Sequence, residues 1–305
     1  MSIPSRSCYC MKSSIFFISN SFNFDASVED LVSSLSFAGT LIEKMESDKF
    51  ISFFKSSDFY ENAVNKIFGP NAIPESGLLS SLIYDGALNR AKCKSVDSSE
   101  ILQLVNKEKP ELDGNWISVF GDFPEPPKVN YENRKVNTEQ DIINFSKGVV
   151  LENTYTCQEY SDVFEGIYRN LIFHPSYNDI ENIDGGVENF ISGILDMFDV
   201  MNSYVPTDGH TEQDIKFING KIKFTTCEEG GGKKRRKNKE SQLNFSFDID
   251  GKIKSFNCEF HCKLEYFDNQ YKKGKYHNNN RMYFGFNKGI KDNNKILIAH
   301  LGSHL

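Results

Sequence analysis

The side chains best suited to chemistry are concentrated in the last 45 residues of this 305-residue chain. Four of the six histidines lie there: His261, His277, His300 and His304. The segment 256–265 alternates between apolar and polar residues, and successive side chains of a strand point to opposite faces. One face would therefore carry Glu259, His261 and Lys263, each about 6 to 7 Å from the next. An imidazole held between a carboxylate and an ammonium group can exchange protons near neutral pH.

Two further strands are predicted to complete this polar face. In the strand 281–286, Arg281 and Tyr283 point one way, and Met282 points into the core. The strand 295–301 is apolar on both faces, which predicts a central position in the sheet with His300 at its end. The residues expected to form a catalytic site are Glu259, His261, Lys263, Arg281, Tyr283 and His300.

Two metal-dependent alternatives fit this inventory less well. Cys258 and Cys262 have a spacing seen in zinc sites, but the alternation places both on the apolar face of their strand. A magnesium nuclease would combine an aspartate of the preceding turn with Glu259 and Lys263, yet those two residues are four apart rather than two. Metal-free RNA cleavage needs a base for the 2′-hydroxyl proton, an acid for the leaving oxygen, and cations for the phosphorane charge. The His, Lys, Arg and Tyr side chains supply all three without a metal or cofactor.

The charge distribution fits either a C-terminal nucleic-acid-binding module held by an acidic N-terminal part or solubility through two oppositely charged faces. The net charge of −7 combines 19 Lys and Arg against 9 Asp and Glu in residues 215–305 with 16 against 33 in residues 1–214. A glycine-rich, basic loop at 229–240 is expected to be flexible and to bind phosphates without reading base sequence. Its basic residues are Lys233, Lys234, Arg235, Arg236, Lys237 and Lys239. A solvated insertion with no role and a nuclear import signal are the alternatives for this loop.

The N-terminal part is predicted to be mainly helical and acidic. A short strand within 15–24 is followed by helical apolar spacing at 27–46, 48–68 and 75–92. Prolines in the segment 120–131 exclude regular structure there. We therefore expect an acidic domain over 1–125 and a linker with helices over 126–165. The acidic domain could restrain the site or recruit a protein partner.

The C-terminal part, residues 166–305, is predicted to be a basic sheet domain with packed helices. A strand at 170–173 precedes a helical stripe at 187–201. The segment 215–224 predicts a hairpin, because Asn219-Gly220 favours the positive φ angles of a tight turn. Further strands are expected at 243–249 and 252–266, joined by a turn at Asp250-Gly251. The whole chain is thus expected to be an α+β protein.

The order of these C-terminal elements resembles the RelE/HigB-type toxin fold. The resemblance covers about 135 residues and includes the Arg281-Met-Tyr-Phe284 strand and the closing strand that ends in His300. It implies RNA as the substrate, metal-free chemistry, and site residues Lys263, Arg281, Tyr283 and His300. The long basic insertion and the roughly 165 N-terminal residues depart from such small toxins.

The sequence lacks the motifs of several common function classes. No Walker loop, dinucleotide-binding glycine fingerprint or Gly-x-Ser-x-Gly elbow is present. No apolar stretch approaches the roughly 18 to 20 residues of a membrane span, and seven scattered cysteines indicate a reducing compartment, so a cytoplasmic location is expected. The sequence favours a toxin-like or anti-phage defence ribonuclease. The alternative is a non-catalytic nucleic-acid- or protein-binding subunit of a bacterial defence complex.

Overall fold

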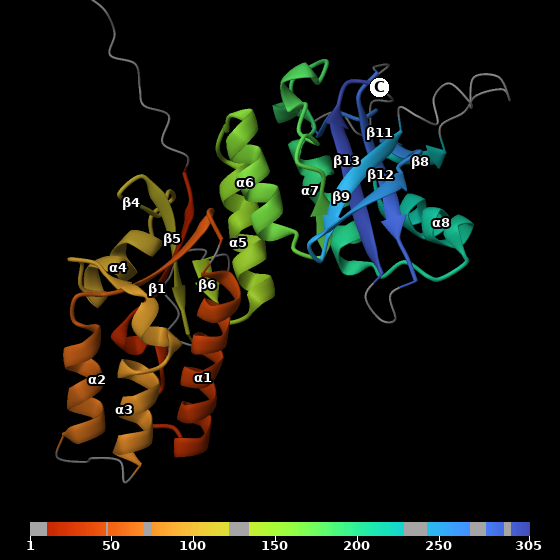
Figure 1. The fold of residues 1–305 in the computed structure, drawn as a ribbon. Coiled ribbons are helices and arrows are strands. Elements are labelled where there is room, and N and C mark those ends of the chain that lie inside the picture. Colours follow the sequence, from red (N-terminus) through yellow and green to blue (C-terminus); the bar gives the residue numbers. More distant parts are fainter. Residues whose placement is uncertain are drawn as a thin grey trace, which may run out of the picture. The chain divides into compact units, whose positions relative to one another are not determined.

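The computed structural model describes residues 11–46, 48–69, 75–121, 134–228, 243–268, 279–289 and 294–305. Figure 1 shows its helices and strands. The chain forms two compact units, residues 1–153 and 154–305. The division falls within the segment expected to link the domains, so that α5 (Glu139–Leu151) belongs to the first unit and α6 (Cys157–Ile167) to the second. Both units contain helices and strands, which confirms the α+β class.

The first unit contains a mostly parallel sheet. Its strands are β1 (Ser13–Phe17), β2 (Ile51–Lys55), β3 (Lys92–Cys93), β4 (Glu111–Leu112), β5 (Asn115–Phe120) and β6 (Lys135–Val136). Their order is β3-β2-β1-β5-β4, with β6 also paired to β5. Only the β4–β5 pairing is antiparallel among these ladders. All five residues of β1 are buried, as expected for the central strand of a parallel sheet.

The helices of the first unit follow the apolar spacing of the sequence. They are α1 (Val28–Met45), α2 (Phe59–Phe68), α3 (Ser76–Tyr84), α4 (Ser98–Val105) and α5. The Ser27 hydroxyl caps α1 by accepting a hydrogen bond from the Asp30 backbone N–H at 3.2 Å. The sequence predicted α1 and a helix in the region of α5. The helix expected over 75–92 forms only in its first half, as α3, and is followed by a short 3₁₀ helix (Ala87–Arg90) and β3. The helix α4, whose start is capped by Asp97, and the short strands β3, β4 and β6 were not predicted.

The prediction of one helix over 48–68 was wrong in its first half. Residues 51–55 form β2, and only Phe59–Phe68 are helical. Phe50, Phe53 and Phe54 have helical spacing, but a short apolar run fits a buried strand equally well. Parallel pairing of β2 with β1 and β3 decides the conformation, and such pairing cannot be read from local spacing.

The second unit is built on a five-stranded sheet. Its strands are β7 (Leu171–Phe173), β8 (Thr225–Glu228), β11 (Phe260–Lys263), β12 (Arg281–Asn287) and β13 (Lys295–Gly302). Their order is β7-β13-β12-β11-β8, and only the β7–β13 pair is parallel. This confirms the strands predicted at 170–173, 281–286 and 295–301. The interior position of β13 and its burial on both faces are also as predicted.

A separate hairpin covers part of one face of this sheet. It consists of β9 (Asn244–Ile249) and β10 (Lys252–Asn257), joined by the predicted turn, in which Asp250 and Gly251 have φ angles of 55° and 75°. In Figure 1, β9 crosses in front of β12 and β13. The apolar side chains of the hairpin pack on the sheet in a cluster of Leu243, Phe247, Ile249, Cys258, Tyr283, Leu297 and Ala299.

The hairpin and the sheet share one stretch of chain, where the sequence predicted a single strand over 252–266. That strand is interrupted, since β10 ends at Asn257 and β11 begins at Phe260. At the interruption the chain closely approaches Gly285 of β12. A Cβ atom there would lie 2.8 Å from the Asn257 carbonyl oxygen and 2.9 Å from the Cys258 Sγ. The chain therefore passes over β12 before it joins the larger sheet.

The prediction of a hairpin over 215–224 was wrong, because most of this segment lies in α8 (Thr211–Lys221), which follows α7 (Ile191–Ser203). Ile215, Ile218 and Ile222 are three and four residues apart, which is helical spacing and does not fit the alternation of a strand. The Asn219 side chain does not form a turn but accepts a hydrogen bond from the Thr226 backbone N–H at 2.8 Å. At the start of α8, the buried Asp214 accepts hydrogen bonds from the Tyr204 hydroxyl (2.5 Å) and the Thr207 N–H (2.9 Å).

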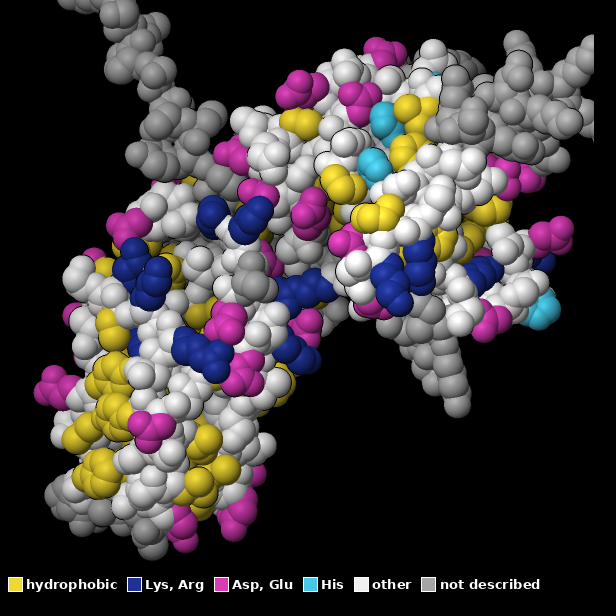
Figure 2. Space-filling view, viewed as in Figure 1, with side chains coloured by type: hydrophobic (Ala, Val, Ile, Leu, Met, Phe, Trp, Pro, Cys, Tyr) yellow, Lys and Arg dark blue, Asp and Glu magenta, His cyan; other side chains and the backbone are white. Residues whose placement is uncertain are grey.

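Several large apolar side chains of the first unit remain exposed. Figure 2 shows hydrophobic side chains over α1, α2 and α3. Those with at least a third of their surface exposed include Phe37, Val64, Phe68 and Leu78. Singly exposed apolar side chains are ordinary on protein surfaces.

Candidate functional site

Four chemically reactive side chains form a row across the second sheet. In the strand register, Cys227 of β8 lies opposite His261 of β11, His261 opposite Tyr283 of β12, and Tyr283 opposite His300 of β13. Residues directly opposite each other in antiparallel strands share a face, with Cβ atoms about 5 Å apart. Three residues that the sequence proposed for the site, His261, Tyr283 and His300, are therefore neighbours.

A β-bulge brings His300 into this row. The register between β12 and β13 shifts after Tyr283, so that Tyr283 faces His300 while Phe284 faces Ile298. Ala299 is the extra residue. In a bulge, two residues of one strand oppose a single residue of the other, and a side chain is re-aimed. The Tyr283 and His300 rings consequently lie with centroids 6.1 Å apart.

Tyr283 lies at the centre of the row and is fully buried. Its ring centroid is 5.3 Å from that of His261 and 6.1 Å from that of His304, which follows β13. The exposed fractions are 4% for His261, 0% for Tyr283 and 7% for His300. The hairpin contributes to this burial, because Tyr283 belongs to the apolar cluster under β9. His304 is exposed at the edge of the row and was not included in the predicted site.

The hydrogen bonds of His300 define its tautomer. Its Nε2 lies 2.7 Å from the Ser303 carbonyl oxygen, which can only accept, so Nε2 carries the proton and Nδ1 is the basic atom of the neutral ring. Burial lowers the pKa of His300, and the Ser303 carbonyl and the Asp179 carboxylate, 3.8 Å away, oppose this shift. A neutral imidazole with a fixed tautomer is suited to accept a proton near neutral pH.

Cys227 is a reactive residue that the sequence did not assign to the site. Its Sγ lies 3.3 Å from Nε2 of His261, within hydrogen-bonding distance for sulfur. The contact orients the His261 ring. Only the pairing of β8 with β11 brings the two together, and their separation of 34 positions in the sequence gives no sign of this contact.

A pair of cations lies on the same face of the sheet, next to His261 and Tyr283. Lys263 and Arg281 are directly opposite each other in the β11–β12 register, two residues from His261 and Tyr283 respectively. Both side chains are partly exposed. Nη1 of Arg281 donates a hydrogen bond to the Asn280 carbonyl oxygen at 2.7 Å. Like charges directly opposite each other in a sheet repel, and an anion bound between them would relieve that repulsion.

Other predicted residues do not join the row. Glu259 precedes β11, in the connection from the hairpin, and is partly exposed. The basic residues Lys233, Lys234, Arg235, Arg236, Lys237 and Lys239 lie outside the described residues, as does His277.

The two cysteines weighed as zinc ligands are held in different surroundings. Cys258 packs under the hairpin beside Tyr283, whereas the Cys262 Sγ lies 3.3 Å from the Thr226 hydroxyl. Burial raises the pKa of both thiols to about 12, which disfavours the thiolate that binds zinc. Over the described ranges, no group of three or more His, Cys, Asp and Glu side chains is placed to hold a metal ion.

Within the described part of the chain, no helix has the length and apolar character needed to cross a membrane. Comparisons with protein-family models, with curated proteins and with solved structures found no match to this chain.

Proposed function

We propose that the second unit cleaves RNA by metal-free acid–base chemistry on the face that carries His261, Tyr283 and His300. The observation that supports this most is the convergence of two imidazoles on one tyrosine, with Lys263 and Arg281 beside them. These side chains come from three strands. They supply the base, the acid and the cations that the reaction needs.

The proposed roles follow from the surroundings of each group. Nδ1 of His300 takes the proton of the 2′-hydroxyl, because its pKa is lowered and its Nε2 proton is held by Ser303. The 2′-oxygen attacks the phosphorus, and the bond to the 5′-oxygen breaks. His261 donates a proton to that leaving oxygen, which yields a 2′,3′-cyclic phosphate and a 5′-hydroxyl. Lys263 and Arg281 stabilise the charge of the phosphorane, and Tyr283 is a positioning residue between the imidazoles.

The experiment is incubation of the purified full-length chain with RNA in EDTA between pH 5 and 8, with the product ends identified. We expect cleavage with cyclic-phosphate ends. His261→Ala and His300→Ala should each reduce the rate by about 10²- to 10⁴-fold, the usual contribution of a general acid or base. His210→Ala, at the start of α8 and outside the row, is the matched control. RNA that stays intact at every pH would refute the proposal.

A second candidate function is favoured by the burial of the row. His261, Tyr283 and His300 expose at most 7% of their surface, which suits a structural cluster in a non-catalytic nucleic-acid-binding unit. In that case RNA binds through the partly exposed Lys263 and Arg281, and cleavage is absent. Binding that survives His261→Ala and His300→Ala without any cleavage would support this function. The toxin-like, defence and protein-partner roles suggested by the sequence remain proposals attached to these two functions.

A further inference from the structure

The first unit contains a cavity at the position where open parallel sheets bind ligands. From β1 the chain crosses through α1 to β2 on one side, and β5 pairs with β1 on the other side. Connections that diverge from two adjacent parallel strands leave a crevice at the carboxyl ends of those strands, and ligands bind there as a general rule. In this unit the carboxyl ends are Phe17 of β1 and Phe120 of β5.

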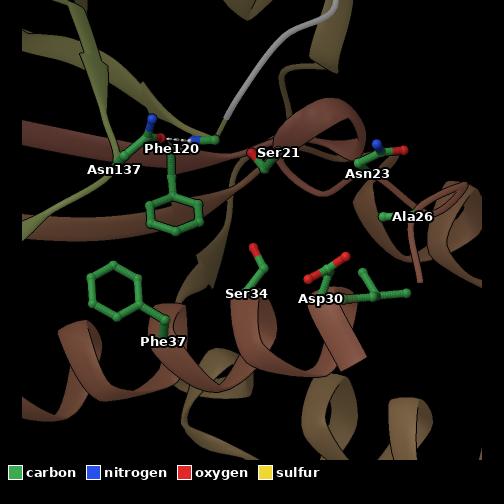
Figure 3. Close-up of a pocket in the computed structure, with 10 residues that line it drawn as sticks. Ser21, Asn23, Ala26, Asp30, Ser34, Phe37, Phe120 and Asn137 are labelled. Atoms are coloured by element: carbon green, nitrogen blue, oxygen red, sulfur yellow. Dashed lines mark hydrogen bonds between the residues drawn. The ribbon is translucent and has the colours of Figure 1, made fainter. Parts of the chain in front are cut away.

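A cavity of about 270 Å³ lies at this crevice, just below the roughly 300 to 1,000 Å³ of most small-molecule sites. It is lined by residues that follow β1, β5 and β6 and by the exposed side of α1. Figure 3 shows the rings of Phe37 and Phe120 at one end of the space, and Asp30 and Ser34 rising from α1 at the other, below Ser21 and Asn23. The two rings have centroids 6.4 Å apart.

A close backbone approach shapes the wall of the cavity beside β5. Gly121 follows Phe120 with a φ of 116°, and a Cβ atom there would lie 2.2 Å from the Ser21 carbonyl oxygen. Its N–H donates to the Asn137 side-chain oxygen at 3.2 Å. Only glycine permits this contact, which fixes the turn after β1 against the end of β5.

The lining chemistry selects against phosphate. Among the described residues that line the cavity, none is Lys, Arg or His, and the only charged one is Asp30. The connection from β1 to α1, residues 18–27, contains no glycine that would let a phosphate approach the backbone. Asp30 and the Ser27 hydroxyl already occupy the start of α1. The site is therefore complementary to an uncharged or cationic ligand.

One end of the cavity is apolar, and the other end offers hydrogen-bond acceptors. The Phe37 and Phe120 rings offer a surface for a planar ring. The Asp30 carboxylate has lone pairs for several donors, one of which is taken by the Ser27 hydroxyl at 2.8 Å. A ligand that fits has a planar ring at one end and neighbouring hydroxyl groups at the other. A nucleoside combines these two parts and carries no phosphate.

We propose that this cavity binds a nucleoside, with the base against Phe37 and Phe120 and the ribose hydroxyls donating to Asp30. The proposal concerns a site in the first unit and is independent of the chemistry proposed for the second. It assigns a small-molecule function to a unit for which the sequence suggested only a restraining or partner-recruiting role.

The test is titration of the full-length chain with adenosine, guanosine, cytidine and uridine by calorimetry. At least one nucleoside should bind, and its 5′-monophosphate should bind more weakly because of repulsion by Asp30. Asp30→Asn should weaken binding by about tenfold or more, as expected for loss of hydrogen bonds to a charged acceptor. Glu29→Gln is the matched control, since Glu29 is the neighbouring acidic residue of the same helical turn and does not line the cavity.

A second pair of variants keeps the test decisive if Asp30→Asn alters folding. Ser34→Phe fills the cavity and should abolish binding, whereas Ser33→Phe, on the adjacent exposed position of α1, should not. Melting curves of both variants establish that they fold. The proposal is overturned if no nucleoside binds at millimolar concentration. It is also overturned if the monophosphate binds more tightly, or if Ser34→Phe binds as well as the parent chain.

Discussion

His261 of β11 and Tyr283 of β12 lie directly opposite each other, with ring centroids 5.3 Å apart and an angle of 43° between the ring planes. The pairing places one imidazole against a fully buried phenol, and the phenol in turn contacts His300. Protonation of either histidine therefore changes the charge beside the same tyrosine.

The stability of the chain should depend on pH through His300. Burial lowers the pKa of His300 below its usual 6.5, and burial also lowers that of His174. The unfolded state then binds the proton more tightly than the folded state. The free energy of unfolding should be highest above about pH 6.5 and should fall as the pH drops below that value. Urea unfolding at several pH values measures this. The free energy of unfolding should depend less on pH in His300→Asn than in the parent chain, and least in the double variant His174→Asn/His300→Asn. An unchanged slope in both variants would contradict this.

The Asp214–Lys288 pair should be important for the stability of the second unit. Asp214 is fully buried, and its Oδ2 lies 2.5 Å from Nζ of Lys288. Asp214→Ala should lower the free energy of unfolding by about 3 to 5 kcal/mol, because it leaves a cation without its buried partner. Glu212→Ala, an exposed change in the same first turn of α8, should stay within about 0.5 kcal/mol. Comparable losses for the two variants in denaturant titrations would argue against this role.

Two glycine-to-alanine changes should have opposite effects. At Gly285 an added methyl meets the Asn257 carbonyl and the Cys258 sulfur, so Gly285→Ala should destabilise by about 1 to 3 kcal/mol through overpacking. Gly220 lies within α8, and nothing lies within 4 Å of its added Cβ. Gly220→Ala should therefore stabilise by about 0.5 to 1 kcal/mol. Thermal melts of both variants, compared with the parent chain, provide the measurement.

The cation pair should contribute to RNA affinity in a salt-dependent manner. If Lys263 and Arg281 each contact a phosphate, removing either should reduce the slope of log affinity against log salt by about 0.7. Filter binding to a single-stranded RNA at several salt concentrations measures this. Lys216→Ala, on the exposed side of α8, is the control. Equal slopes for Lys263→Ala, Arg281→Ala and the control would show that the pair does not contact phosphates.

The sequence predicted strands best where apolar and polar residues alternate along the strand itself. In β12, Arg281 and Tyr283 alternate with Met282 and Phe284 as predicted, but Tyr283 is fully buried in an apolar cluster rather than on a polar face. The parallel sheet of the first unit was largely missed, because strands such as β2 and β5 are defined by pairing with distant segments. Asn219-Gly220 has the composition of a tight turn, but both residues lie in the last turn of α8.

The candidate site was only partly predictable for the same reason. Alternation alone placed His261 and Lys263 on one face. The position of His300 depends on a bulge at Ala299, and that of Cys227 depends on the register of β8 with β11. Neither feature has a local signal in the sequence. The cavity of the first unit could not be predicted either, because its lining residues, such as Asp30 and Asn137, lie far apart in the sequence.

The short connection between β10 and β11 has a mechanical consequence. Only Cys258 and Glu259 separate the hairpin that covers Tyr283 from the strand that carries His261. This two-residue connection passes close to Gly285 of β12, where an added Cβ atom would lie 2.9 Å from the Cys258 Sγ. The short connection therefore ties the position of the hairpin over Tyr283 to the position of His261 at the start of β11.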